Sequence, residues 1–131
     1  SRMTKAEFVN PTTLAKITGY SHVVKIGNIV YISGQMALDA DGNMIGISDP
    51  EAQVRQVWSN IDNALIAVGG SLRNILSTTT YITSNEVRPA MNKVRLELFP
   101  SNPPTSTGLV ISALAREGAL IEIQATAHID T

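Results

Sequence analysis

The chain has 131 residues, of which 44% are hydrophobic and 16% are charged, with a formal net charge of −1 and no cysteine. This composition fits one folded domain spanning 1–131 and excludes a disordered chain. The lack of cysteine excludes disulfides and thiolate metal sites, and the near-neutral charge makes nucleic acid an unfavoured partner. No apolar run reaches the roughly 20 residues that cross a bilayer, and we expect a cytoplasmic protein without a signal peptide. Ser1-Arg2 before Met3 is interpreted as a cloning remnant.

The first expected elements are two neighbouring strands, 22–26 and 29–36. Both are rich in valine, isoleucine and tyrosine, and the Gly27-Asn28 dipeptide between them is typical of a tight turn. Alternate residues of the second strand would share one face of the sheet; they are Ile29, Tyr31, Ser33 and Gln35. Because a half-polar, half-apolar face is a poor surface to expose, this pattern favours an oligomer.

A helix is expected next. Ser48 and Glu51 have the spacing of a capping box, and Pro50 between them is tolerated in a first turn. Apolar residues then recur every three or four positions until Gly69-Gly70, which predicts one buried stripe along the helix. These residues are Val54, Val57, Ile61, Leu65 and Val68.

The second half of the chain predicts a strand, a helix and two more strands. The first strand covers 75–83, and the helix covers 87–99 and ends before Pro100. Two final strands are expected at 107–114 and 119–129. The order β-β-α-β-α-β-β predicts an α+β domain with a mixed sheet and both helices on one face.

The last strand alternates apolar residues with polar ones, namely Glu122, Gln124, Thr126 and His128. The polar face is either exposed to solvent or closed by identical subunits that share polar clefts, and we favour the second interpretation. Glu122 is open to two interpretations in the same way. In a cleft it would orient water or accept a substrate N–H with a raised pKa, whereas in the open it is a surface glutamate.

Motifs for other chemistries are missing. His22 and His128 are the only histidines and are interpreted as structural, so no metal site is predicted. No Gly-rich phosphate loop opens a helix, and Ser33 has neither a Gly-x-Ser-x-Gly context nor a base beside it. We therefore expect neither nucleotide binding nor serine-hydrolase chemistry.

Three segments together resemble the YjgF/RidA family, whose members also carry the description endoribonuclease L-PSP. They are Gly19-Tyr20-Ser21, 24–35 and 120–125, and the resemblance extends over 11–129 in matching order. It implies a chorismate-mutase-like fold and a homotrimer with three ligand clefts between subunits. It also implies hydrolysis of enamines and imines to 2-oxo acids and ammonia without a cofactor.

The resemblance also implies roles for single residues. Glu122 would position the water molecule, and seven other residues would contact the substrate: Tyr20, Ser33, Gly34, Asn92, Ser106, Thr107 and Gly108. The family pattern Pro-x-Arg-Ser/Thr falls on 104–107, so Ser106 stands where many members have a carboxylate-binding arginine. An arginine fork matches a carboxylate, and a serine hydroxyl does not.

We therefore predict a homotrimer that binds a small metabolite in its subunit clefts and hydrolyses an enamine, an imine or a related C=N bond. The missing arginine argues against the usual 2-imino acid substrates. The alternative is a ligand-binding or regulatory trimer without catalysis. A ribonuclease or translation inhibitor has less support, because single-strand binding favours basic grooves and stacking rings and only 5% of residues are aromatic.

Overall fold

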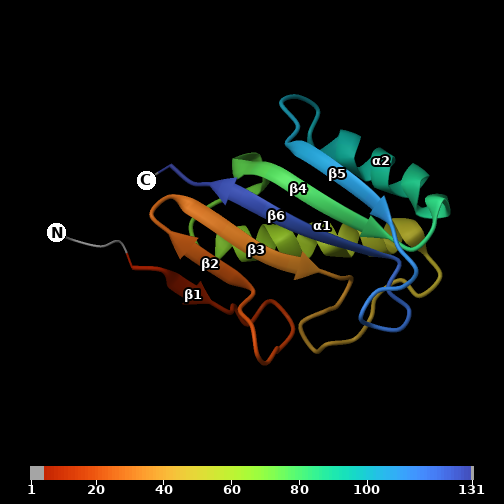
Figure 1. Cartoon of the computed structure of the whole chain (residues 1–131), viewed down its shortest axis with the longest axis horizontal. Helices are drawn as coiled ribbons and strands as arrows, with labels where there is room; N and C mark the ends of the chain where they lie inside the picture. Colours follow the sequence, from red (N-terminus) through yellow and green to blue (C-terminus); the bar gives the residue numbers. More distant parts are fainter. Residues whose placement is uncertain (1–4, 131) are drawn as a thin grey trace.

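The structure, a computed structural model, describes residues 5–130 as a six-stranded mixed sheet with two helices packed against one face (Figure 1). The strands are β1 (Glu7–Val9), β2 (Val23–Ile26), β3 (Ile29–Gln35), β4 (Ile75–Ile82), β5 (Thr105–Val110) and β6 (Ile121–His128). The helices are α1 (Pro50–Ile66) and α2 (Arg88–Leu98), and the short 3-10 turns are η1 (Leu72–Asn74) and η2 (Asn85–Val87). The α+β prediction is confirmed. Ser1-Arg2 lie outside the described residues.

The sheet order is β1-β2-β3-β6-β4-β5. Only the β4–β5 pair is parallel among the described pairs, since the chain crosses from one strand to the next through α2. The last strand, β6, therefore inserts between β3 and β4 at the centre of the sheet. Within residues 5–130 no helix has the length and apolar character needed to cross a membrane.

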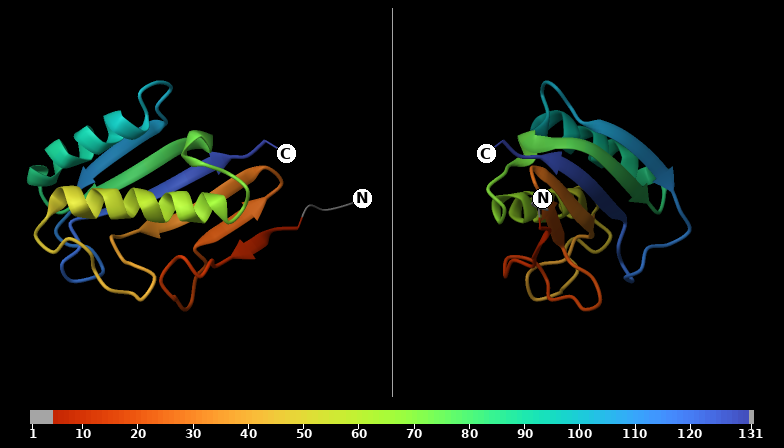
Figure 2. Two further views of the ribbon diagram at one scale, coloured as in Figure 1. Left: turned by 180° about the vertical axis from the view of Figure 1, so that it is seen from behind. Right: turned by 60° about the vertical axis from the view of Figure 1, so that its left-hand side comes forward.

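The view from behind shows both helices on the same face of the sheet (Figure 2). The hydrophobic core lies between them and the strands. The predicted stripe of α1 faces the sheet, with Val54, Val57, Ile61 and Leu65 fully buried. The apolar face of β6 meets it with Ile121, Ile123, Ala125 and Ala127. Burying a side chain of this size contributes about 1.5–3 kcal/mol, so the period of the apolar residues fixes which face of each element turns inward.

The start of α1 differs from the expected capping box. Asp49 is the N-cap, and its carboxylate accepts a hydrogen bond from the Ala52 N–H at 3.1 Å. Ser48 lies outside the helix with φ 61°. Pro50 is the first helical residue, where its missing N–H costs nothing, so the cap is the residue directly before it.

The edges of the sheet also differ from expectation. The strand predicted at 107–114 begins two residues earlier and ends four residues earlier, as β5. It pairs with β4 and extends only as far as β4 does. Its last bond runs from the Ile111 N–H to the Ile82 carbonyl, at 2.8 Å. The three-residue strand β1 was not predicted, and it lies at the other edge beside β2. The remaining elements agree with prediction to within two residues at each end.

A β-bulge in β3 changes the face to which Gln35 belongs. Ile32 pairs with Ala125 and Gln35 with Ile123, so three steps on β3 oppose two on β6. Gln35 therefore turns to the helix side and is buried, and the prediction that it shares a face with Tyr31 and Ser33 is wrong. The bulge leaves Gly34 against the neighbouring strand.

Candidate functional site

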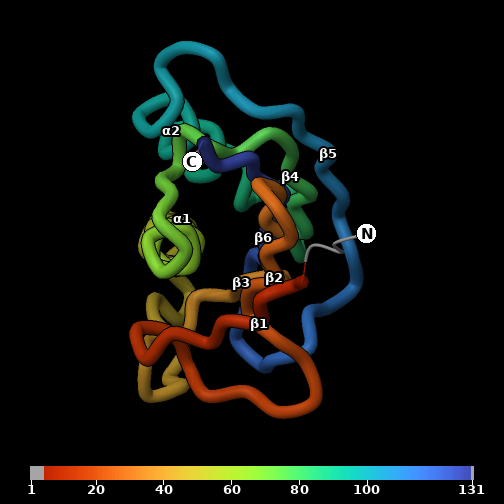
Figure 3. Tube along the Cα trace, turned by 90° about the vertical axis from the view of Figure 1, so that its left-hand side faces the viewer, coloured from red at the N-terminus to blue at the C-terminus, as the bar shows by residue number. Residues whose placement is uncertain are grey.

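The face of the sheet opposite the helices is uncovered in the described chain, with α1 on one side of the strands and no helix on the other (Figure 3). The strand register places Glu122 on this open face, where Tyr81 of β4 is its direct cross-strand neighbour. The side chains around it on this face are mostly polar; they are Tyr31, Ser77, Thr79, Thr107, Leu109, Gln124 and Thr126.

The Glu122 carboxylate rests against Gly34. A Cβ atom added at Gly34 would lie 2.5 Å from Glu122 Oε2 and 2.7 Å from its Cδ, so any side chain there would displace the carboxylate. Glu122 is half-buried, and burial raises the pKa of its carboxyl above the ordinary value. No ion pair between Glu122 and a cation occurs among residues 5–130. A half-buried carboxyl without a cation beside it holds its proton more tightly than an exposed one.

Ser33 ties β3 to the loop that carries Tyr20. Its N–H donates to the His22 carbonyl at 2.9 Å, and its hydroxyl donates to the Ser21 carbonyl at 2.6 Å. Tyr20 remains 56% exposed and shares with Gly34 the lining of a hollow of about 20 Å³. That volume holds roughly one water molecule, so one chain alone does not enclose a metabolite here.

His22 and Gln35 hold the bulge from behind. His22 is buried, its Nε2–H donates to the Ala15 carbonyl at 2.7 Å, and its Nδ1 accepts from Gln35 Nε2 at 3.1 Å. The same Gln35 amide donates to the Ser33 carbonyl at 3.1 Å. Both ring nitrogens are thus used within the fold, which gives His22 a structural role. His128 is exposed on the open face, with Nδ1 3.7 Å from Asp130.

Ser106 and Gly108 lie on the other face of the sheet. They pair with Thr78 and Thr80, whose side chains are buried beneath the helices, whereas Thr107 between them points to the open face. Arg95 of α2 donates from Nη1 to Ser106 Oγ at 3.3 Å, which confirms the side on which Ser106 lies.

The predicted residues therefore form two groups. Tyr20, Ser33, Gly34 and Glu122 lie together and are called the Glu122 group. Asn92, Ser106 and Gly108 lie at the junction of α2 and β5 and are called the Ser106 group. Thr107 shares the face of Glu122 but lies two strands away, about 10 Å. Because the two groups face opposite sides of the sheet, a small ligand cannot contact both within one chain.

Sequence reasoning missed Tyr81 and Arg95. Tyr81 could have been found only from the strand order, which brings β4 beside β6. Arg95 had a local signal, since residues three apart on a helix lie on the same side and Asn92 was already a candidate.

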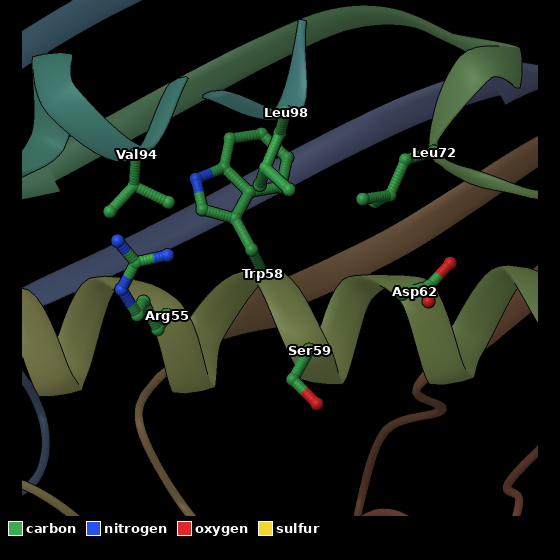
Figure 4. A pocket seen from close by; sticks show the side chains of 7 residues that line it. All are labelled: Arg55, Trp58, Ser59, Asp62, Leu72, Val94 and Leu98. Carbon is green, nitrogen blue, oxygen red and sulfur yellow. The ribbon is translucent and has the colours of Figure 1, made fainter. Parts of the chain in front are cut away.

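A cavity of about 250 Å³ between α1 and α2 is separate from both groups (Figure 4). Its wall includes Trp58, whose buried Nε1 has no hydrogen-bond partner in the part of the chain that the structure describes. Arg55 at its rim is bound to Glu51 and Glu97. No cluster of three His, Asp or Glu suited to a metal ion occurs within residues 5–130. The open sheet face and its β5 edge are the candidate site.

Known proteins share this sequence pattern and fold. The family model described as Endoribonuclease L-PSP matches residues 11–129. The chain is 34% identical over 110 residues to the 3-aminoacrylate deaminase RutC of Acinetobacter baylyi, covering 84% of this chain and 86% of that protein. The Rid family protein YyfA of Yersinia pestis superposes with a TM-score of 0.89 at 30% identity, covering 95% of this chain and all of that one. RidA of the Antarctic bacterium Psychrobacter sp. PAMC 21119 superposes with a TM-score of 0.87 at 28% identity, covering 94% of this chain and 99% of that one.

Proposed function

The chain belongs to the endoribonuclease L-PSP family, also called the YjgF/RidA family, and on this basis we propose that it hydrolyses enamines or imines without a cofactor in clefts between the subunits of a homotrimer. The observation that carries the proposal is the half-buried Glu122 carboxyl, which has a raised pKa and rests on Gly34 at the uncovered face. The name of the Acinetobacter relative supports the same class of substrate.

The reaction needs one group that can both give and take a proton. An enamine becomes an imine when its carbon is protonated, water then adds to the C=N carbon, and the carbinolamine expels ammonia to leave a carbonyl group. Overall, an imine and water give a ketone or aldehyde and ammonia. Glu122 donates to the enamine carbon or to the departing nitrogen and accepts a proton from the attacking water, so it ends the cycle as it began.

Tyr20 and Ser33 would orient the substrate beside Glu122. The exposed phenol of Tyr20 can donate or accept a hydrogen bond. The Ser33 hydroxyl donates to the Ser21 carbonyl and so presents its lone pairs as acceptors for a substrate N–H. Ser33 is held in place by its bonds to the Ser21 and His22 carbonyls, and the Tyr20 ring lies edge-on to His22 with ring centroids 6.3 Å apart.

The division of the site into two groups supports an assembly of identical chains. The Glu122 group of one subunit would face the Ser106 group of the next, which brings both sets of residues to one ligand. The open face also exposes Tyr31 and Leu109, and Phe8 and Ile26 extend the apolar surface along β1 and β2. Soluble monomers rarely leave such a surface bare. A monomer in sedimentation at micromolar concentration would contradict this assembly.

Hydrolysis is tested by generating 2-iminobutanoate, 2-iminopropanoate and 3-aminoacrylate in situ and following release of ammonia and the carbonyl product. The wild-type protein should accelerate at least one of these reactions, and Glu122→Gln should abolish the acceleration. Ser106 in place of an arginine favours the second candidate, a trimer that binds its ligand without catalysis. If none of the three reactions is accelerated, the second candidate stands and the hydrolase is rejected.

A further inference from the structure

The side of α2 that faces β5 carries a cation directly beside Ser106. Arg95 reaches across from the helix, and its Nη1 lies 3.3 Å from Ser106 Oγ. We propose that Arg95 binds the carboxylate of the substrate, with Ser106 as its partner, in place of a strand arginine at position 106. The inference rests on the proposed function, because it names the residue that binds the carboxylate of that same substrate.

Arg95 differs from the neighbouring cations in its partners. Lys93 bonds to Glu51 at 2.9 Å, and Arg55 of α1 bonds to Glu97 at 2.9 Å. Arg95 makes no ion pair with any carboxylate among residues 5–130. A guanidinium has five N–H donors, and the bond to Ser106 uses one of them. The others are left to receive an anion.

The two sides of α2 have opposite characters. Lys93 and Glu97 face α1, as their contacts show. Asn92 and Arg88 lie three and seven residues before Arg95, so helical spacing places both on the β5 side with it. That side of α2 carries two guanidinium groups and an amide without an acidic residue of the helix, which favours a negatively charged ligand.

The β5 surface next to Arg95 leaves room for such a ligand. A Cβ atom added at Gly108 would meet no described atom within 4 Å, so the space above the strand is open. The Ser106 hydroxyl, which accepts from Arg95, can itself donate to a carboxylate oxygen. The guanidinium fork and the hydroxyl would then hold a carboxylate by charge-assisted hydrogen bonds.

The same geometry gives a reason for serine at position 106. An arginine at 106 would bring a second positive charge to the same side of β5, within reach of Arg95, where like charges repel. The arginine on the helix and the small residue on the strand therefore form a matched pair, and moving the arginine from 95 to 106 should restore what Arg95→Ala removes.

The test compares Arg95→Ala, Arg95→Lys and the double variant Arg95→Ala/Ser106→Arg with Lys93→Ala. Lys93→Ala is the matched control, because it removes one positive charge from the same helix on the side that faces α1. Two quantities are measured for each protein: kcat/KM for 2-iminobutanoate, and the affinity for the stable anion 2-oxobutanoate against its neutral analogue 2-oxobutanamide. Unfolding midpoints show that each variant is folded.

We expect Arg95→Ala to lower both kcat/KM and the affinity for 2-oxobutanoate about 10- to 100-fold, the effect of one charge-assisted contact. Affinity for 2-oxobutanamide should stay within about threefold, as should every property of Lys93→Ala. Arg95→Lys should recover only part of the loss, because an ammonium lacks the fork. The double variant should recover at least about tenfold over Arg95→Ala.

The outcomes separate this inference from the proposed function. Hydrolysis that is equally fast in wild type and Arg95→Ala would overturn the role of Arg95 and leave the hydrolase intact. A wild type that binds 2-oxobutanoate through Arg95 but hydrolyses no imine would support the role and reject the hydrolase. A wild type that neither binds the anion nor hydrolyses the imine overturns both.

Discussion

The Glu122 group and the Ser106 group differ in how firmly the fold holds them. Gly34 and Glu122 lie on the adjacent inner strands β3 and β6, and a bulge, a buried histidine and a buried glutamine fix their positions. The Ser106 group lies on an edge strand whose residues are all exposed, and on the side of α2 that faces this strand. Buried contacts therefore fix the positions of Gly34 and Glu122, whereas no such contacts among the described residues fix the Ser106 group.

This difference indicates which positions of the chain tolerate substitution. A side chain at Gly34 cannot be added without moving the Glu122 carboxylate that packs against it. The Ser106 group meets little resistance to change, because open space surrounds Gly108 and Arg95 reaches its partner from another element. We therefore expect the proton chemistry to depend on the first group and the choice of substrate on the second.

The strongest test of this contrast is Glu122→Gln. The amide keeps the size of the side chain but cannot exchange a proton, and general acid–base groups contribute typically 10²- to 10⁴-fold. We expect kcat/KM for imine hydrolysis to fall at least about 100-fold, measured by ammonia release. Glu117→Gln, an exposed glutamate of the loop before β6, is the control and should keep full activity. Equal losses in the two variants would remove Glu122 from the mechanism.

Gly34→Ala should have the next largest effect. The added methyl group must push the Glu122 carboxylate from its position, since a Cβ there would come within 2.5 Å of Oε2. Displacement of a reacting group by about 1 Å costs up to about 100-fold, so we expect a 10- to 100-fold loss in kcat/KM. Stability should change little, because the carboxylate is the free end of a flexible side chain. Full activity in this variant would mean that the position of the carboxylate is not critical.

Gln35→Ala tests whether the interior holds the Glu122 group in place. The substitution leaves His22 Nδ1 and the Ser33 carbonyl without their donor in a buried environment. Such losses cost about 1–3 kcal/mol, which denaturant unfolding would measure as a lower midpoint with an unchanged slope. Asn43→Ala is the control, because it removes an exposed amide whose side chain makes no hydrogen bond among the described residues, and it should cost less. Equal losses of unfolding free energy in the two variants would mean that Gln35 does not support the bulge.

Most of the fold could be predicted from the sequence, because its signals are local. The period of the apolar residues gave α1 and its buried side, and Gly27-Asn28 gave the two-residue turn between β2 and β3. The pairing of strands could not be predicted this way. The bulge that turns Gln35 inward and the end of β5 both depend on the neighbouring strand, which is distant in the sequence.

The site followed the same division. The alternation along β6 made Glu122 a candidate and the family resemblance added Gly34, although neither could indicate that the two are in contact. Ser106 was placed opposite the family arginine by aligning the segment 104–107 alone. That segment contains no cation, so the site was expected to have none near the strand. Arg95 supplies one from α2, eleven residues earlier in the chain, and only the packing of the helix against β5 brings it there.

The pH dependence of stability provides a smaller effect with a definite sign. Burial raises the pKa of Glu122 in the folded protein above the ordinary value of 4.5, so the folded state binds the proton more tightly than the unfolded state. The free energy of unfolding should therefore fall as pH rises from about 4.5 through the folded pKa. Glu122→Gln lacks this decline and should gain stability relative to wild type across that range, measured by denaturant unfolding at several pH values. A constant difference between the two proteins would contradict the burial of the carboxyl.

Gly108→Ala should have the smallest effect on stability, and it should raise stability where Gln35→Ala lowers it. Glycine inside a strand is less favourable than alanine by roughly 0.5–1 kcal/mol, and no described atom would oppose the new methyl group. We therefore expect the variant to be slightly more stable in denaturant unfolding, whereas Gly34→Ala gains nothing because it meets Glu122 at once. The same methyl group would enter the space assigned to the substrate carboxylate, so kcat/KM should fall a few-fold as stability rises. A gain in stability with unchanged kcat/KM would indicate that the ligand does not approach β5. The Glu122 group and the Ser106 group would then differ in how firmly the fold holds them, but the Ser106 group would have no part in choosing the substrate.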